Sequence, residues 1–212
     1  REGLLPAIVF IFSRGACDQA VKQCLQSGLR LTTSDEREEI VSVIEERIHN
    51  LSESDLQVLG FSDWAESLNR GIAAHHAGLL PIFKEVIEEL FQRNLIKVVF
   101  ATETLALGIN MPAKTVLLER LTKWNGEGHV PVPPGEYTQL TGRAGRRGID
   151  IEGNAVILWS QDIDASSAAG LASTRTYPLR SSFKPTYNMT VNLIHQMGRE
   201  RARRSLGSSF AQ

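Results

Sequence analysis

Short, apolar segments alternate along this chain with longer segments whose apolar residues recur at helical spacing. The segment 6–12 (PAIVFIF) is rich in β-branched residues and carries no polar side chain. A strand of this kind fits a parallel sheet covered by helices on both faces, because both of its sides are buried. Further strand-like segments stand at 72–74 (IAA), 97–101 (KVVFA), 115–118 (TVLL) and 154–159 (NAVILW). The alternation predicts an α/β fold with a doubly wound, mostly parallel sheet flanked by helices.

The segments between the strands predict helices, and two of them carry clear start signals. Thr33 and Glu36 form a T-x-x-E capping box ahead of a stripe of Ile and Val residues between positions 40 and 48. Pro81 suits the first turn of a helix over 82–93. Further helices are expected at 17–25, 53–59, 62–68 and 187–206. Another is expected after Gly135, and it would carry the arginine-rich segment described below.

The length of 212 residues and the 42% hydrophobic content are enough for one core with an appendage. We expect a first domain over residues 1–162, a Ser-, Ala- and Gly-rich linker over 163–182, and a helical region over 183–212. The longest apolar run is too short to span a membrane and no signal peptide is evident. Because the chain opens at Arg1 without a methionine, we expect a piece of a longer, cytoplasmic protein that has no membrane contact.

The formal net charge of -1 provides no overall attraction to nucleic acid, but the charges are unevenly distributed. After residue 165 the chain carries seven bases against the single acid Glu200. This tail is either a face for nucleic acid or an ordinary solvated helix surface.

The segment 139–148 (QLTGRAGRRG) places Arg143, Arg146 and Arg147 between glycines. A guanidinium is always charged and presents a rigid fork of donors, so this arrangement suits the binding of phosphate. The chain nevertheless contains no GxxxxGK[ST] loop to cradle a nucleotide. The glycine spacing also differs from a GxGxxG dinucleotide fingerprint. The arginines therefore predict phosphate chemistry on a nucleotide that this chain does not hold by itself.

Three polar segments follow predicted strands, at the sheet edge where open α/β proteins place their ligands. The first contains Ser13 and Arg14, and the second contains His76 and Gly78 ahead of a helix start. The third contains Thr102 and Thr104, which offer hydroxyl groups. It continues to Gly108, where a ligand can come close to the backbone, and Asn110, which offers an amide. Each segment alone also fits an ordinary loop. Because His75 and His76 point to opposite faces of a strand, they cannot share one metal, and no metal site is expected.

The order of these segments, FIFSR, HHAGL, ATETLALGINMPA and QLTGRAGRRG, resembles the motifs of the second RecA-like domain of superfamily-two helicases. The longer strings ATETLALGINMPAKTVLLE and YTQLTGRAGRRGID are similar to the superkiller-like, DEVH-type group. The stretch LASTRTYPLRSSF adds a likeness to the HelY-type helicases of actinobacteria, and 181–194 resembles the start of a winged-helix region.

The resemblance implies roles for individual residues. Arg146, as the favoured arginine finger, and Arg143 would reach the γ-phosphate, with Gln139 beside the same phosphates. Gly108 and Asn110 would lie near the ribose, and Arg147 would contact the nucleotide or form a salt bridge with a carboxylate such as Asp150. The positions that would contact the backbone of a single strand are Ser13, Arg14, His76, Gly78, Thr102 and Thr104.

The resemblance also implies cofactors and partners. The cofactor is ATP with Mg²⁺, bound mainly by a first RecA-like domain of the same chain, so that this segment alone would be inactive. The substrate is single-stranded RNA, with DNA as an alternative because backbone contacts do not read the 2′-hydroxyl. RNA-degradation machinery is a further candidate partner. A RecA-like module that only binds RNA or docks a protein remains the non-catalytic alternative.

Overall fold

The computed structural model describes residues 3–49, 51–106, 111–161, 163–174 and 186–208. The chain divides into two compact units, Arg1–Ser173 and Thr174–Gln212. The first unit contains the sheet and all of the predicted site residues.

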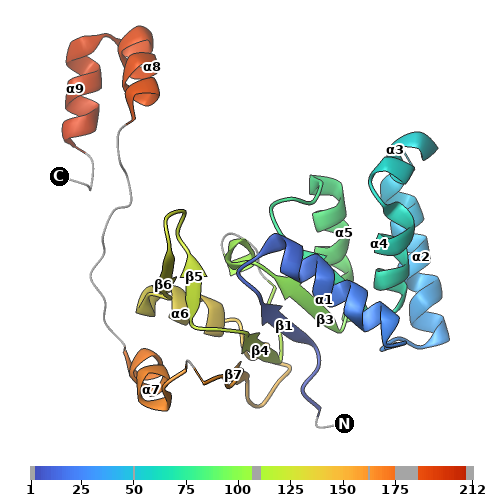
Figure 1. Ribbon diagram of the computed structural model, residues 1–212. Helices are drawn as coiled ribbons and strands as arrows, with labels where there is room; N and C mark the ends of the chain where they lie inside the picture. The colour runs from blue at the N-terminus through green and yellow to red at the C-terminus, as the bar shows by residue number, and fades with distance from the viewer. Residues whose placement is uncertain (1–2, 50, 107–110, 162, 175–185, 209–212) are drawn as a thin grey trace. The chain divides into compact units, whose positions relative to one another are not determined.

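A five-stranded sheet forms the centre of the first unit (Figure 1). Its strands are β1 (Ala7–Phe10), β2 (Ile72–His75), β3 (Val98–Ala101), β4 (Thr115–Leu118) and β7 (Asn154–Ile157), in the order β2-β3-β1-β4-β7. Every pairing in this sheet is parallel. The predicted α/β fold with a parallel sheet is therefore confirmed, and the carboxyl ends of β1, β2 and β3 meet at one edge.

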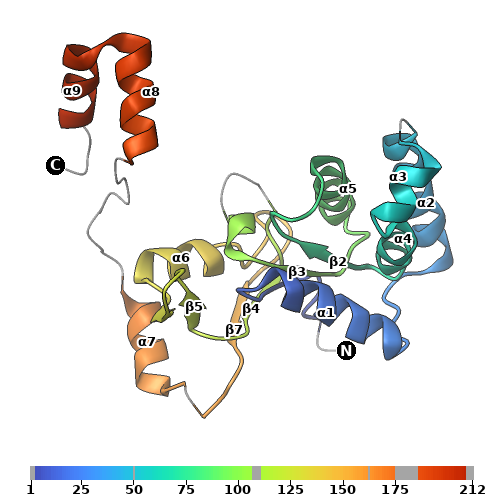
Figure 2. The ribbon, with the colours of Figure 1, turned by 45° about the horizontal axis from the view of Figure 1, so that its top comes forward.

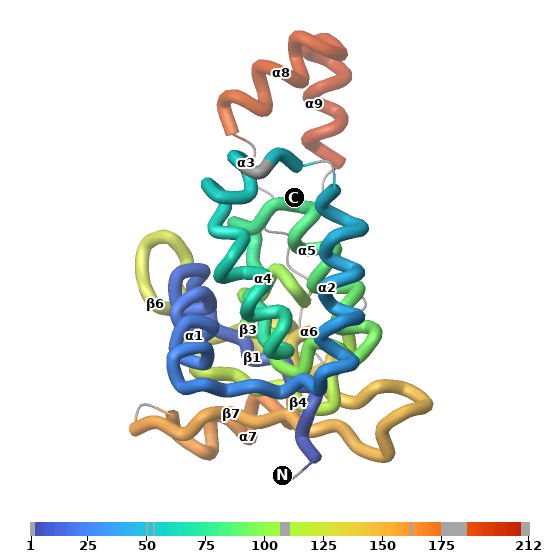
Figure 3. The backbone as a smooth tube through the Cα atoms, turned by 90° about the vertical axis from the view of Figure 1, so that its right-hand side faces the viewer, coloured from blue at the N-terminus to red at the C-terminus, as the bar shows by residue number. Residues whose placement is uncertain are grey.

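Helices cover both faces of this sheet, as the buried strands require. Helices α1 (Arg14–Gln26), α4 (Phe61–Asn69) and α5 (Pro81–Gln92) contact strands of the sheet, whereas α2 (Ser34–Ile48) and α3 (Glu53–Val58) pack on α4. Helices α1 and α5 lie on opposite faces (Figure 2). Helix α2 packs against α5 and α4 (Figure 3). The predicted capping box at the start of α2 is confirmed, because Thr33 and Glu36 exchange both side-chain to backbone hydrogen bonds.

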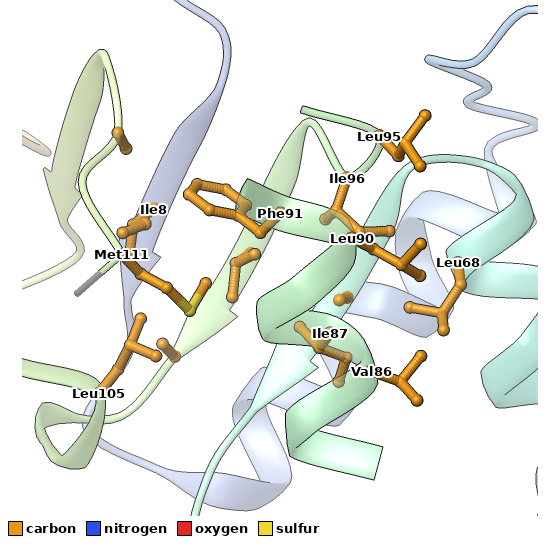
Figure 4. Packing of buried hydrophobic residues seen from close by; sticks show 14 of the residues in the cluster. Ile8, Leu68, Val86, Ile87, Leu90, Phe91, Leu95, Ile96, Leu105 and Met111 are labelled. Carbon is orange, nitrogen blue, oxygen red and sulfur yellow. The ribbon is translucent and has the colours of Figure 1, made fainter. Parts of the chain in front are cut away.

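The hydrophobic core beneath α5 also includes the residues just before β4. Ile87 and Leu90 of α5 are fully buried, and Phe91 is 3% exposed. Met111, which precedes β4, is fully buried and lies beside Phe91 (Figure 4). This packing holds the segment immediately before β4 against the sheet.

The arginine-rich segment departs from the expected helix. Helix α6 (Pro134–Thr141) ends before it, with Gly142 as its C-cap. Beyond the cap, Ala144 forms an isolated bridge with Ala113, and Gly145 adopts a left-handed φ of 89°. The prediction that the helix carries the arginines is wrong, because α6 ends at Thr141 and the left-handed φ at Gly145 keeps the following residues from continuing the helix.

Several smaller elements complete the chain. They are the 3₁₀ helix η1 (Glu103–Ala106), the antiparallel hairpin of β5 (Thr122–Trp124) and β6 (His129–Pro131), and helix α7 (Ala165–Ser173). Helix α7 lies in the stretch expected to be a linker, yet it packs on α6 and belongs to the first unit. Its Asp164 accepts hydrogen bonds from the backbone amides of Ser166 and Ser167, which starts a helix despite the low-complexity composition.

The described part of the second unit contains two helices, α8 (Tyr187–Met197) and α9 (Arg199–Gly207), which pack on each other. A single helix over 187–206 was expected, but Gly198 has a left-handed φ of 77° and separates the two. None of the helices in the described ranges of either unit has the length and apolar character of a membrane span.

Candidate functional site

Ser13 and Arg14 come three and four residues after the end of β1, at the edge of the sheet where β2 and β3 also end. The Ser13 hydroxyl oxygen accepts a hydrogen bond from the backbone amide of Ala16 at 3.3 Å and caps α1. Arg14 is the first residue of α1 and its side chain is exposed. Ser13 therefore starts the helix that presents the Arg14 guanidinium to solvent.

His76 and Gly78 lie beside Arg14, although they come from the end of β2. The Gly78 amide donates to His76 Nδ1 at 3.1 Å, so this nitrogen is the unprotonated acceptor of the ring. His76 Nε2 then carries the proton and donates to Asp18 Oδ1 of α1 at 2.9 Å. A Cβ built on Gly78 would lie 3.6 Å from Arg14 Cδ. Arg14, His76 and Gly78 thus form one cluster, and Asp18 orients the imidazole of His76.

The two adjacent histidines bind carboxylates on opposite faces of the sheet. His75 Nε2 lies 2.8 Å from Glu88 Oε1 of α5, whereas His76 pairs with α1. Burial lowers the pKa of His75, so its ring is neutral at pH 7. Both rings are enclosed, since His75 is 2% and His76 5% exposed. A phosphate near this edge would therefore meet Arg14 and the backbone at Gly78 before it met the His76 ring.

Thr102 and Thr104 follow β3 and are joined by their hydroxyl groups. The two Oγ1 atoms lie 2.9 Å apart, and the Thr102 amide donates to the His75 carbonyl oxygen at 3.3 Å. Thr102 is 6% exposed, whereas Thr104 is exposed. The buried threonine thus positions the exposed one. Gly108 and Asn110, the predicted ribose neighbours, lie outside the described residues.

The arginine loop, which carries Arg143, Arg146 and Arg147, is held in place by backbone contacts. The Ala113 amide donates to the Arg143 carbonyl oxygen at 2.9 Å, and the Gly145 amide donates to the Ala113 carbonyl oxygen at 2.7 Å. On its other side the loop touches Gly153, where a Cβ would lie 2.4 Å from the carbonyl carbon of Ala144. The backbone at Ala113 and at Gly153 therefore packs against two sides of the loop and restricts its conformation.

Arg143 and Gln139 line one hollow next to this loop. Its volume is about 390 Å³, and its other lining residues are Ala106, Pro112, Thr138 and Gly142. Arg143 Nη2 donates to the carbonyl oxygen of Ala106 at 2.6 Å, and burial lowers the pKa of this guanidinium. Gln139 is exposed on α6. The structure brings these two predicted residues together at the end of η1.

Arg146 lies on the other side of the loop and is engaged by Asp150. Its Nε donates to Asp150 Oδ2 at 2.8 Å and its Nη2 to Oδ1 at 2.9 Å. Its Nη1 makes a longer contact of 3.4 Å with Asn94 Oδ1. The ion pair lowers the pKa of Asp150 to about 2 and raises that of Arg146. Asp150 thus pairs with Arg146, and no bridge between Arg147 and Asp150 is present among the described residues.

Arg147 is exposed and makes no hydrogen bond or ion pair with the residues that the structure describes. Together with Arg146, Asn94 and Gly145 it lines a second hollow of about 1050 Å³. The donors around both hollows are guanidinium and amide groups, which fit the phosphoryl oxygens of a nucleotide. In the described ranges, no group of three or more His, Cys, Asp or Glu side chains could hold a metal ion.

Sequence reasoning missed three residues that shape these sites, namely Asp18, Asn94 and Ala106. Asp18 follows Arg14 by four residues, so it lies on the same helix face and could have been suspected from helical spacing. Asn94 and Ala106 meet arginines that are 52 and 37 positions away in the chain. No local pattern indicates contacts of that kind.

Comparison with known proteins identifies the domain. Residues 19–148 match the family model described as "Helicase conserved C-terminal domain". The chain is 65% identical over 211 residues to probable helicase HelY of Mycobacterium tuberculosis, covering 100% of this chain and 23% of that protein. It is 42% identical over 191 residues to superkiller complex protein 2 of Homo sapiens, covering 90% of this chain and 15% of that protein.

A third relative is ATP-dependent RNA helicase mtr4 of Schizosaccharomyces pombe, which is 40% identical over 193 residues. That match covers 91% of this chain and 17% of the relative. The chain thus spans less than a quarter of the length of these three proteins. By family model, similarity and fold, the chain belongs to the helicase conserved C-terminal domain family, as the second RecA-like domain of a superfamily-two helicase of the superkiller-like group.

Proposed function

We propose that this domain is the second motor domain of an ATP-dependent RNA helicase. Its arginine loop contacts the phosphates of ATP-Mg²⁺ held mainly by a first RecA-like domain, and its strand ends grip the backbone of single-stranded RNA. The observation that carries the proposal is the hydrogen bond from Arg143 Nη2 to Ala106. It joins the arginine loop to η1, which follows Thr102 at the nucleic-acid edge.

The nucleotide side of the proposal assigns separate tasks to the arginines. Arg146 would place a guanidinium edge near the γ-phosphate, and Arg143 with Gln139 would lie beside the same phosphates. Arg147, with Gly108 and Asn110, would complete the contacts with the nucleotide. An arginine supplied from a second domain stabilises the charge that develops during phosphoryl transfer, and such an arginine is worth about 10³ to 10⁵ in rate.

The nucleic-acid side rests on the cluster of Arg14, His76 and Gly78. The exposed Arg14 side chain, the backbone near Gly78 and the Thr104 hydroxyl can meet phosphate oxygens. Ser13, His76 and Thr102 would act mainly by holding these groups in place. Contacts with the sugar-phosphate backbone carry no sequence information, which suits a motor that moves along any strand.

RNA is favoured over DNA because relatives of this chain are named as RNA helicases, the mtr4 protein among them. The human relative is named as a superkiller complex protein, which supports a partner in a multiprotein complex, with RNA-degradation machinery as the candidate. A competition between matched RNA and DNA strands in an unwinding assay separates the two substrates. Preferential unwinding of DNA would contradict this assignment.

The test of the proposal is ATP hydrolysis by the full-length protein with and without single-stranded RNA. Arg146→Ala is expected to lower turnover by at least about a hundredfold. Arg30→Ala, which removes an exposed arginine before α2, is the matched control and should hydrolyse ATP like the unmodified protein. Unchanged turnover in Arg146→Ala would exclude the proposal and favour a module that only binds RNA or docks a protein.

A further inference from the structure

Asp150 holds both the backbone and the side chain of Arg146. Its Oδ2 atom accepts from the Arg146 amide at 3.0 Å and from Nε at 2.8 Å, while Oδ1 accepts from Nη2 at 2.9 Å. The Asp150 side chain is 6% exposed and that of Arg146 is 19% exposed. A bidentate pair of this kind fixes the plane of the guanidinium as well as its position.

This pairing uses only one edge of the guanidinium. Arg146 has five N–H donors, and Asp150 takes the one on Nε and one of the two on Nη2. The end that carries Nη1 keeps its donors, and its contact with Asn94 Oδ1 is the longest at 3.4 Å. Arg146 and Asn94, the residue that Nη1 contacts, both line the hollow of about 1050 Å³, as does Arg147. The guanidinium is therefore anchored along one side and can donate from the other.

We propose that Asp150 is a positioning residue that orients Arg146 so that its Nη1 end reaches the phosphoryl group during hydrolysis. This inference rests on the proposed function, because it assumes that Arg146 contacts the phosphates. An arginine that is already oriented loses less conformational freedom when it engages the charge that develops in the transition state. The carboxylate is ionised throughout the neutral range, since the ion pair lowers the pKa of Asp150 to about 2.

The experiment measures kcat and KM for ATP of the full-length protein at saturating single-stranded RNA. Asp150→Asn preserves the size of the side chain but removes the charge and one of the two acceptor oxygens. It should lower kcat by about tenfold or more, with a change in KM of less than about threefold, because the lost orientation matters most in the transition state. Asp150→Glu, which restores the carboxylate, should recover part of the lost kcat.

The matched control is Glu66→Gln, because Glu66 pairs with Arg70 Nε at 2.7 Å with the same spacing of four residues, in α4. This variant should keep the kcat of the unmodified protein. A double variant, Arg146→Ala with Asp150→Asn, separates positioning from a general loss of structure. If Asp150 acts through Arg146, the double variant has the same kcat as Arg146→Ala alone.

The outcomes distinguish this inference from the proposed function. A normal kcat in Asp150→Asn, together with a strongly reduced kcat in Arg146→Ala, overturns the positioning role and leaves the proposed function in place. A further decrease in the double variant also overturns it, since Asp150 would then act independently of Arg146. A normal kcat in Arg146→Ala overturns the proposed function itself.

Discussion

Arg143 and Ala106 are 37 residues apart in the chain, yet Arg143 Nη2 lies 2.6 Å from the carbonyl oxygen of Ala106. Ala106 is the last residue of η1, which directly follows Thr102. This hydrogen bond links the arginine loop to the segment that leaves β3. We therefore expect a movement of either segment to affect the other.

Arg143→Lys should weaken the stimulation of ATP hydrolysis by single-stranded RNA. Lysine keeps the charge but is a point donor that cannot match the planar guanidinium, so the contact with Ala106 is lost or lengthened. A hydrogen bond from a charged group contributes about 1.5–3 kcal/mol, so the ratio of stimulated to basal turnover should fall about tenfold. Arg120→Lys, at an exposed pair with Glu119, is the control. An unchanged ratio in Arg143→Lys would show that coupling follows another route.

Gly78→Ala should weaken the binding of single-stranded RNA. The added Cβ would lie 3.1 Å from His76 Nδ1, so the imidazole has to move and its hydrogen bond to the Gly78 amide is strained. Loss of about 1 kcal/mol corresponds to an increase of about fivefold in the dissociation constant. Gly15→Ala is the matched control, because its Cβ would meet nothing within 4 Å. Equal affinities of both variants, measured by fluorescence anisotropy, would argue against a role for this cluster.

His75 predicts a pH dependence of the free energy of unfolding. Burial lowers its pKa in the folded state, whereas in the unfolded chain it takes up a proton below about pH 6.5. Below about pH 6.5 the unfolded state thus binds more protons than the folded state. The free energy of unfolding therefore decreases as the pH falls through this range. Urea unfolding at pH 7.5 and 5.5 should show a smaller decrease in stability for His75→Gln than for the unmodified protein. His49→Gln, at an exposed histidine, should keep the full decrease.

Gly153→Ala should displace the arginine loop. Its Cβ would lie 2.4 Å from both the carbonyl carbon of Ala144 and the amide nitrogen of Gly145, and neither backbone atom can rotate away. We expect a loss of about 1–3 kcal/mol in the free energy of unfolding, as for other overpacked sites, together with reduced ATP hydrolysis. Gly128→Ala, in the turn between β5 and β6, has nothing within 4 Å of its Cβ and should be neutral. Retention of full stability by Gly153→Ala would contradict the tight packing.

The elements with strong local signals were predictable from the sequence. The buried strands are continuous apolar runs, and the start of α2 was indicated by Thr33 and Glu36, whose hydrogen bonds span only three residues. The alternation of side chains along a strand likewise predicted that His75 and His76 face opposite sides of the sheet. These features depend on neighbours along the chain, so their physical cause is contained in a short segment.

The partners of the functional side chains were decided by the tertiary structure. Both Arg146 and Arg147 are close enough in sequence to pair with Asp150, and the fold pairs it with Arg146, which follows the left-handed turn at Gly145. The contact between Arg143 and Ala106 exists because the end of α6 packs next to η1. The sequence by itself determined the five strands of the parallel sheet, the capping box of α2 and the order of the motifs. Only the folded chain determined which donor meets which acceptor, because such contacts depend on how distant elements pack on a common sheet.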